Sequence, residues 1–144
     1  MMKFKNYLKE ILTKKPSVKT VHKGAMDYES QFEAAGETYV FRAHDTMYTD
    51  DWAIFFHKLN VDPNKPWEPS GDKGSQAFEV FAGVGEALKK FIKKQKPDYF
   101  HFRASGASRI KLYKKMARVI ERKSGYEHIT TKTTGKDLIF YFSK

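Results

Sequence analysis

The stretch that decides the predicted fold occupies residues 77–125 and reads AFEVFAGVGEALKKFIKKQKPDYFHFRASGASRIKLYKKMARVIERKSG. Residues 78–81 have the apolar character of a short strand, and the small residues 82–85 indicate a turn into a Lys-rich helix. A second strand-like run follows at 99–103, and small residues at 104–107 open a second basic helix that Gly125 ends. This alternation predicts a β-α-β-α unit with a parallel strand pair. We expect a site where the strand ends meet the helix N-termini, because backbone N–H groups are unpaired there.

The net charge of the chain is concentrated in the same region. The whole chain carries 27 Lys or Arg against 17 Asp or Glu, a formal net charge of +10. Residues 83–123 contain 13 Lys or Arg and three acids, which is also +10, so the remainder of the chain is neutral. Such a field favours an anionic partner, which would be nucleic acid, a phosphorylated cofactor or an acidic protein. The alternative, that the charged faces are solvated and keep the protein soluble, stays open.

The first half of the chain predicts one helix and an antiparallel meander. Apolar residues at helical spacing within 3–14 indicate a short amphipathic helix that Pro16 ends. Residues 17–23 could form a short strand, alternating patterns predict strands at 28–34 and 37–44, and the apolar run 52–59 predicts a central strand. Short turns between them predict antiparallel pairing.

Residues 61–75 contain three prolines and two glycines, which predicts a loop. Trp67 in this loop either pins it onto the body of the protein or contacts a substrate. Strands at 126–133 and 137–142 predict a terminal hairpin. The expected order is α-β-β-β-loop-β-α-β-α-β-β. It predicts a single α+β domain over residues 1–144, with a largely antiparallel mixed sheet, a central parallel pair and flanking helices.

The composition excludes several kinds of chemistry. The chain has no cysteine, which excludes disulfides, thiol nucleophiles and Cys-based zinc sites. The five histidines have no ligand spacing, so we expect no metal. The N-terminal residues are charged, and no segment approaches the ~18 apolar residues of a membrane span, so we expect a cytoplasmic protein.

In this order the residues resemble the GNAT N-acetyltransferase superfamily. FEVFAGVGEALKKFI at 78–92 stands where that family has its fourth strand, a loop that holds the pyrophosphate of acyl-CoA, and a helix. KPDYFHFRA at 96–104 stands where the fifth strand splays away, and ASRIKLYKKMA at 107–117 where a helix carries a Tyr beside the thioester sulfur. The chain is also similar to a group of small GNAT-like proteins carried by bacteriophages, which would place it in the host cytoplasm.

The resemblance implies a cofactor and a set of site residues. Acetyl-CoA is the implied cofactor, its pyrophosphate lying against the backbone of Phe81, Ala82, Gly83, Val84 and Gly85. Its phosphates would also meet Ser105, Arg109 and neighbouring lysines. Tyr113 is the implied general acid, although its helical spacing also suits a core aromatic. Glu79, next to the expected acyl site, is the first candidate for the general base, and the other candidates are Asp45, Asp50, Asp51 and His57.

Two functions follow from these observations. The first is an acyltransferase that moves an acetyl group from acetyl-CoA to an unidentified amine acceptor. The alternative is a non-catalytic, basic GNAT-like binding protein, plausibly phage-encoded, that contacts nucleic acid or an acidic host or virion protein. In that alternative the contact is made by the basic helices and the aromatic residues interleaved with them, which are Tyr99, Phe100, Phe102 and Tyr113.

Overall fold

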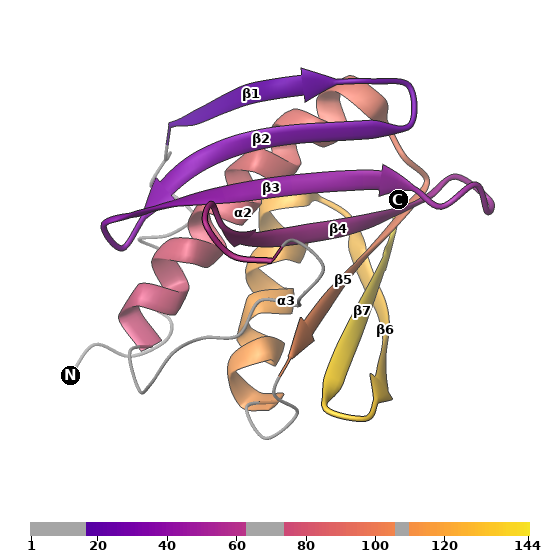
Figure 1. Ribbon diagram of the computed structural model, residues 1–144. Coiled ribbons are helices and arrows are strands. Elements are labelled where there is room, and N and C mark those ends of the chain that lie inside the picture. Colours follow the sequence, from indigo (N-terminus) through magenta and orange to yellow (C-terminus); the bar gives the residue numbers. More distant parts are fainter. Residues whose placement is uncertain (1–16, 63–73, 106–109) are drawn as a thin grey trace.

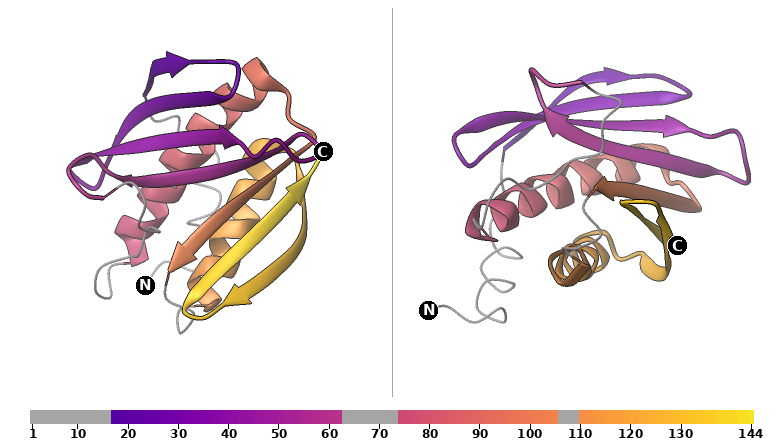
Figure 2. Two further views of the ribbon diagram at one scale, coloured as in Figure 1. Left: turned by 45° about the vertical axis from the view of Figure 1, so that its right-hand side comes forward. Right: turned by 60° about the horizontal axis from the view of Figure 1, so that its bottom comes forward.

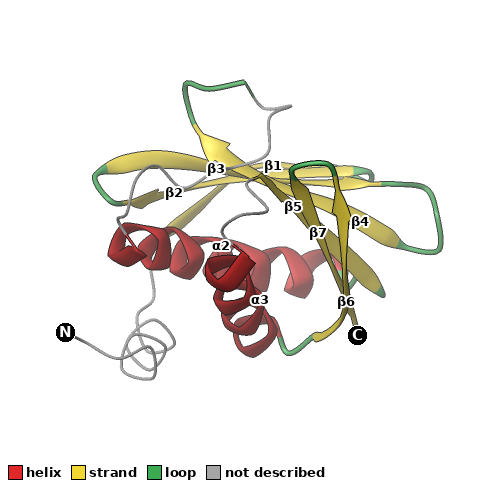
Figure 3. Cartoon of the chain, turned by 90° about the horizontal axis from the view of Figure 1, so that it is seen from below, coloured by secondary structure: helices red, strands yellow, loops and turns green. Residues whose placement is uncertain are grey.

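The computed structural model describes residues 17–62, 74–105 and 110–144, which form one mixed sheet with two helices against one of its faces (Figure 1, Figure 3). The strands are β1 Val18–Lys23, β2 Asp27–Ala34, β3 Glu37–Asp45, β4 Asp51–Lys58, β5 Tyr99–Ser105, β6 Glu127–Thr134 and β7 Asp137–Ser143. The helices are α2 Gly74–Gln95 and α3 Ile110–Ser124. The helix predicted at 3–14 and Trp67 lie outside the described residues.

The sheet contains one parallel pair among otherwise antiparallel strands. Its order is β1-β2-β3-β4-β5-β7-β6. Strands β1 to β4 form the predicted meander, and β6 and β7 form the predicted terminal hairpin. The parallel pair is β4 with β5, and α2 is the connection between them. The predicted α+β class, with a largely antiparallel sheet and a central parallel pair, is therefore confirmed.

The strand and turn predicted at 78–85 are wrong, because these residues lie inside helix α2. This 22-residue helix buries Ala77, Phe81, Val84, Leu88 and Phe91, whose spacings of three and four residues follow one helical face. A short apolar run does not by itself distinguish a strand from a buried helix segment, and the glycines at 83 and 85 mimic a turn. The parallel partner of β5 is consequently β4, not residues 78–81.

Gly83 and Gly85, inside α2, allow close packing on two different neighbours. A Cβ atom at Gly83 would lie 2.1 Å from a ring carbon of Phe32 on β2. A Cβ atom at Gly85 would lie 2.9 Å from the side chain of Lys123 on α3. Glycine destabilises a helix interior by about 1 kcal/mol relative to alanine, so its presence here reflects the space that these neighbours need.

An aromatic core fills the layer between the helices and the sheet. Phe91 of α2 packs on Trp52 of β4 and Tyr28 of β2, with ring centroids 5.1 and 5.3 Å away. Phe100 of β5 stacks on Phe142 of β7 at 4.9 Å. Fully buried aromatic rings contribute large apolar areas, so this layer supplies most of the stabilisation that holds α2 on the sheet.

A buried ion pair joins the two helices. Lys123 Nζ of α3 donates to Glu86 Oε1 of α2 at 2.8 Å, and the Lys123 side chain is only 2% exposed. Lys89 Nζ lies 3.6 Å from the same oxygen. Because a buried cation without a partner is strongly unfavourable, the pair fixes how the two helices face each other.

Candidate functional site

The parallel strands β4 and β5 separate after four residue pairs. Their pairing runs from Asp51 beside Tyr99 to Ile54 beside Phe102. Beyond that point β4 stays paired with β3, and β5 stays paired with β7. Figure 1 and Figure 2 show the two strands starting side by side and then diverging. We call residues 55–58 of β4 and 103–105 of β5 the splay.

At the splay the facing edges of β4 and β5 are no longer paired with each other, and no other strand in the described part of the chain lies between them. In a continuous sheet the backbone groups of these edges would share hydrogen bonds, so at the splay they need other partners. Open α/β sheets bind ligands at the carboxyl ends of their parallel strands. Helix α2 follows β4 in the chain, and α3 follows β5. The first N–H groups of a helix are unpaired and favour anions. The splay is therefore the candidate site of this fold.

His57 brings a buried ring nitrogen to the splay. Its neighbour Phe56 packs on Phe102 in the core, so His57 points to the sheet face opposite the helices. Nδ1 lies 2.7 Å from the carbonyl oxygen of Lys58 and must donate to it, since a carbonyl only accepts. In the neutral ring Nε2 then carries the lone pair. That nitrogen is buried, and it has no hydrogen-bond partner among the residues that the structure describes; the residue is only 7% exposed.

Tyr113 and Ser105 meet at the end of the splayed strand. The Tyr113 hydroxyl, on the first turn of α3, donates to the carbonyl oxygen of Ser105, the last residue of β5. The Tyr113 ring is fully buried, with its centroid 6.3 Å from that of Phe140. The structure therefore brings together two of the residues that the resemblance implies. Arg109 lies outside the described residues.

The predicted phosphate cradle at Phe81, Ala82, Gly83, Val84 and Gly85 is absent from its expected position. All five residues are buried in the interior of α2. Backbone N–H groups in a helix interior bond to carbonyl groups four residues earlier, so they are not available to a pyrophosphate. The prediction failed because it depended on a strand-to-helix turn that the chain does not make here.

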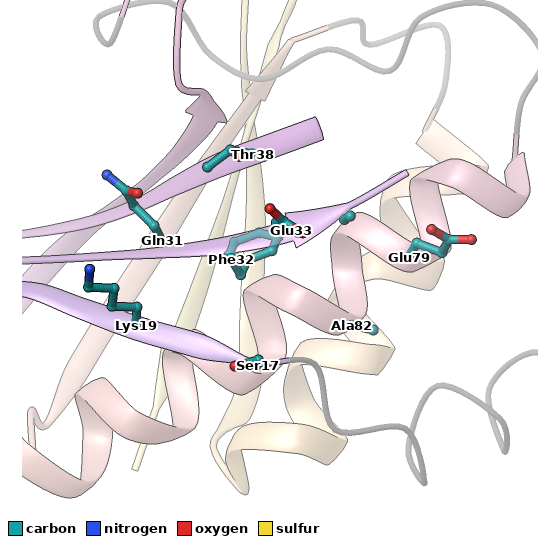
Figure 4. A pocket seen from close by; sticks show the side chains of 9 residues that line it. Ser17, Lys19, Gln31, Phe32, Glu33, Thr38, Glu79 and Ala82 are labelled. Atoms are coloured by element: carbon teal, nitrogen blue, oxygen red, sulfur yellow. The ribbon is translucent and has the colours of Figure 1, made fainter. Parts of the chain in front are cut away.

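Glu79 lies on α2 and not on a strand, so the strand placement that made it a candidate base is wrong. Its Oε2 accepts a 2.9 Å hydrogen bond from the backbone N–H of Ala35, in the β2–β3 turn. Figure 4 shows Glu79 on the helix side of a pocket of about 520 Å³, with Lys19 on the opposite side. The pocket is lined by Ser17, Lys19, Gln31, Phe32, Glu33, Ala34, Thr38, Glu79 and Ala82.

The other candidate carboxylates lie at the opposite end of the sheet. Asp50 Oδ2 accepts the backbone N–H of Asp98, and its Oδ1 accepts the indole N–H of Trp52 at 3.3 Å. Asp51 lies 3.1 Å from Nδ1 of His101. These contacts anchor the start of β4 against β5. They hold the closed end of the parallel pair together, whereas the splay is at its other end.

The sequence made His57 one of the less favoured base candidates, and the structure places it at the splay. The sequence does contain an indication of this position, because His57 is a polar residue inside WAIFFHKL, the most apolar run of the first half of the chain. Only the pairing of β4 with β5 shows that this run, and not residues 78–81, borders the splay. Among the residues that the structure describes, no cluster of His, Cys, Asp or Glu could hold a metal ion. No described helix is long and apolar enough to cross a membrane.

Solved structures of acetyltransferases are similar to this chain at low sequence identity. AAC(6')-Ib in complex with ribostamycin and coenzyme A is 13% identical, with a TM-score of 0.45 over 83% of this chain and 65% of that chain. A spermidine N-acetyltransferase chimera from Vibrio cholerae and hSSAT is 9% identical, with a TM-score of 0.48 over 85% and 69%. A GNAT-family acetyltransferase from Bacillus anthracis is 12% identical, with a TM-score of 0.42 over 83% and 65%.

The fold that the resemblance implied is present in this chain. The strand order and the splayed parallel pair are those that the resemblance implied, so the expected α+β fold with a mixed, largely antiparallel sheet is confirmed. The chain spans less than two thirds of the first structures it matches, 61% of a probable acetyltransferase and 65% of AAC(6')-Ib. No protein-family model matches the sequence, and no curated protein matches it.

Proposed function

We propose that the protein is a GNAT-like acyltransferase that acetylates an amine, with its chemistry at the splay. The observation that carries the proposal is the buried, unpartnered Nε2 of His57 beside diverging strands. Acetyl-CoA would supply the acyl group. The strand edges of the splay are the part of the chain that suits such a ligand, in place of the cradle expected at 81–85.

His57 is the proposed general base. A protonated amine is not nucleophilic, so a base must take its proton before attack on a carbonyl carbon. His57 suits this role because Nδ1 donates to the Lys58 carbonyl oxygen and thereby leaves the lone pair on Nε2. The proton would move from the amine nitrogen to Nε2.

Tyr113 is the proposed general acid. As the amide C–N bond forms and the thioester C–S bond breaks, its hydroxyl would give a proton to the departing sulfur of CoA. In the structure this hydroxyl donates to the Ser105 carbonyl oxygen at the end of β5. That bond also anchors the start of α3 to the end of β5. Replacing Tyr113 by Phe removes the proton but keeps the buried ring, so it separates proton donation from packing.

Calorimetry and a thiol-release assay test the proposal. We expect saturable heat on titration with acetyl-CoA, and absence of heat at millimolar acetyl-CoA would remove the acyltransferase. With a panel of polyamines and aminoglycosides as acceptors, His57→Gln should bind acetyl-CoA normally but turn over at least roughly 100-fold more slowly, the usual contribution of general-base catalysis. The matched control is Glu79→Gln. If it abolishes turnover and His57→Gln does not, the base is Glu79.

The second candidate, a non-catalytic basic binding protein, has lost part of its basis. Phe100, Phe102 and Tyr113, expected to interleave with the basic residues at a surface, are fully buried. Tyr99 is 40% exposed. A binding function in this chain would therefore depend on charge, without a row of stacking rings.

A further inference from the structure

Four lysines from two elements line a pocket remote from the splay. The pocket has a volume of about 370 Å³ and lies between the β1–β2 hairpin and the C-terminal half of α2. It is lined by Thr20, Lys23, Tyr28, Lys90, Lys93 and Lys94. None of the described residues that line it carries a carboxylate, so they concentrate positive charge within one concave surface.

The walls of this lysine pocket are tied together by hydrogen bonds. Lys90 Nζ donates to the backbone carbonyl of Val18 on β1 at 2.6 Å. Gln95 Nε2 donates to the carbonyl of Gly24, in the β1–β2 turn, at 3.0 Å. The ring of Tyr28 packs on Phe91 beneath the pocket. The helix and the hairpin therefore hold the lysines in a fixed arrangement.

The four lysines form no ion pair with a carboxylate in the described parts of the chain. The nearby acids have other partners: Asp27 Oδ1 lies 2.8 Å from His22 Nε2, and Glu29 Oε1 lies 3.6 Å from Arg42 Nε. Like charges three and four residues apart on a helix repel each other. The C-terminal dipole of α2 favours Lys93 and Lys94 but does not explain why Lys23 of β1 lines the same pocket.

The pocket is at the opposite end of the sheet from the splay. Lys23 pairs with Tyr28 at the start of β2, Asp27 with His44, and Asp45 with Trp52 at the start of β4. The splay begins four residues into β4, after Ile54. Four strand residues span about 13 Å, and β1 lies three strands from β4 in the sheet, roughly another 14 Å. A ligand whose phosphates lie at the splay therefore does not account for these lysines.

We propose that the lysine pocket binds the phosphate backbone of nucleic acid without sequence preference. Exposed lysines continue along α2 from Lys89 to Lys94 and to Lys96 just after the helix ends, about 10 Å in all. This length matches roughly three successive charges of one nucleic-acid strand. The ring at the pocket, Tyr28, is only 2% exposed, so bases are not stacked there. Backbone contact by point charges alone gives sequence-independent binding. This site acts independently of acyl transfer.

Fluorescence anisotropy with labelled DNA tests this proposal. Single-stranded and duplex oligonucleotides of two unrelated sequences are titrated at several salt concentrations. Wild-type protein should bind both sequences equally, and its log affinity should fall linearly with log salt. The double variant Lys93→Gln/Lys94→Gln should reduce that slope by about 2, because each lysine that contacts a phosphate contributes roughly 1.

The matched control removes the same charge from α3. Lys111 and Lys114 are exposed on that helix and do not line the pocket. Lys111→Gln/Lys114→Gln should leave most of the salt slope intact. An equal loss in both variants would show that diffuse charge binds DNA and would overturn the pocket. Equal competition by polyglutamate of the same charge would overturn the assignment to phosphate, as would no binding at 50 mM salt. Unchanged far-UV circular dichroism and an unchanged midpoint of urea unfolding show that the variants are folded.

Discussion

Replacing Gly83 tests whether glycine is needed at this position for close packing, as the structure indicates, and not for the phosphate cradle that the sequence predicted. In Gly83→Ala the new methyl carbon would lie 2.1 and 2.2 Å from two ring carbons of Phe32. Carbon atoms normally touch at about 3.5–4.0 Å, so the ring or the helix must move by roughly 1.5 Å. Phe32 is 2% exposed and stacks on Tyr39 at 5.6 Å, so its ring has little space into which to move.

The expected effect is a loss of stability although alanine is the better helix former. Overpacking a core costs typically 1–3 kcal/mol, and this overlap places Gly83→Ala at about 3 kcal/mol. The gain in helix propensity offsets about 1 kcal/mol of that cost. The net loss of about 2 kcal/mol in the free energy of unfolding corresponds to a melting temperature lower by roughly 4–8 °C for a chain of this size.

Urea unfolding followed by circular dichroism measures this change, and a double-mutant cycle identifies its cause. On a Phe32→Leu background the smaller side chain makes room for the methyl group, so Gly83→Ala should there be neutral or stabilising. If Gly83→Ala instead raises the stability of the wild-type protein by about 1 kcal/mol, helix propensity alone decides the outcome and the packing argument is refuted.

Three further predictions concern buried polar groups. Lys123→Met should lower the free energy of unfolding by about 3 kcal/mol, because it leaves Glu86 without its closest cation, whereas Glu86→Leu/Lys123→Met should be close to neutral in the same urea titration. Tyr113→Phe should cost about 1 kcal/mol through the lost bond to the Ser105 carbonyl oxygen, and an unchanged unfolding midpoint would contradict that bond. Burial, followed by nearby carboxylates, raises the pKa of Tyr126 above its usual 10. Above pH 10 the unfolded state loses the Tyr126 proton while the folded state still holds it. The contribution of this group to the free energy of unfolding is therefore complete below pH 10 and falls as the pH rises above 10. In thermal melts between pH 9 and 11, Tyr126→Phe should lose less stability than wild type.

The predicted strands follow from alternation and were confirmed where alternation was clear. Residues 28–34, 37–44 and 99–103 place apolar side chains at every second position, and each forms a strand. The basic helix after residue 107 was also correct, since Tyr113, Met116, Ala117 and Ile120 keep helical spacing and are buried. The strand predicted at 78–81 was wrong, because this apolar run is too short to show its period. The small residues that follow it suit a turn as well as a tightly packed helix.

The candidate site changed more than the fold. Tyr113 and Ser105 were predicted and are in contact, while the cradle at 81–85 depended on a turn that is absent and Glu79 on a strand that is a helix. His57 gained importance only when β4 was identified as the parallel partner of β5. Side-chain orientation and the end of strand pairing both depend on register, and register is set by residues far apart in the chain.

The sequence by itself determined the α+β class, the meander, the terminal hairpin and the concentration of charge within residues 83–123, because periodicity and composition are local properties. The tertiary structure decided which strands are parallel neighbours and where they separate. It also decided that Gly83 faces Phe32 and that Gly85 faces Lys123. It also decided that Lys23 and three lysines of α2 share one pocket. Each of these facts joins segments distant in sequence, and only the packing of α2 across the sheet brings them together.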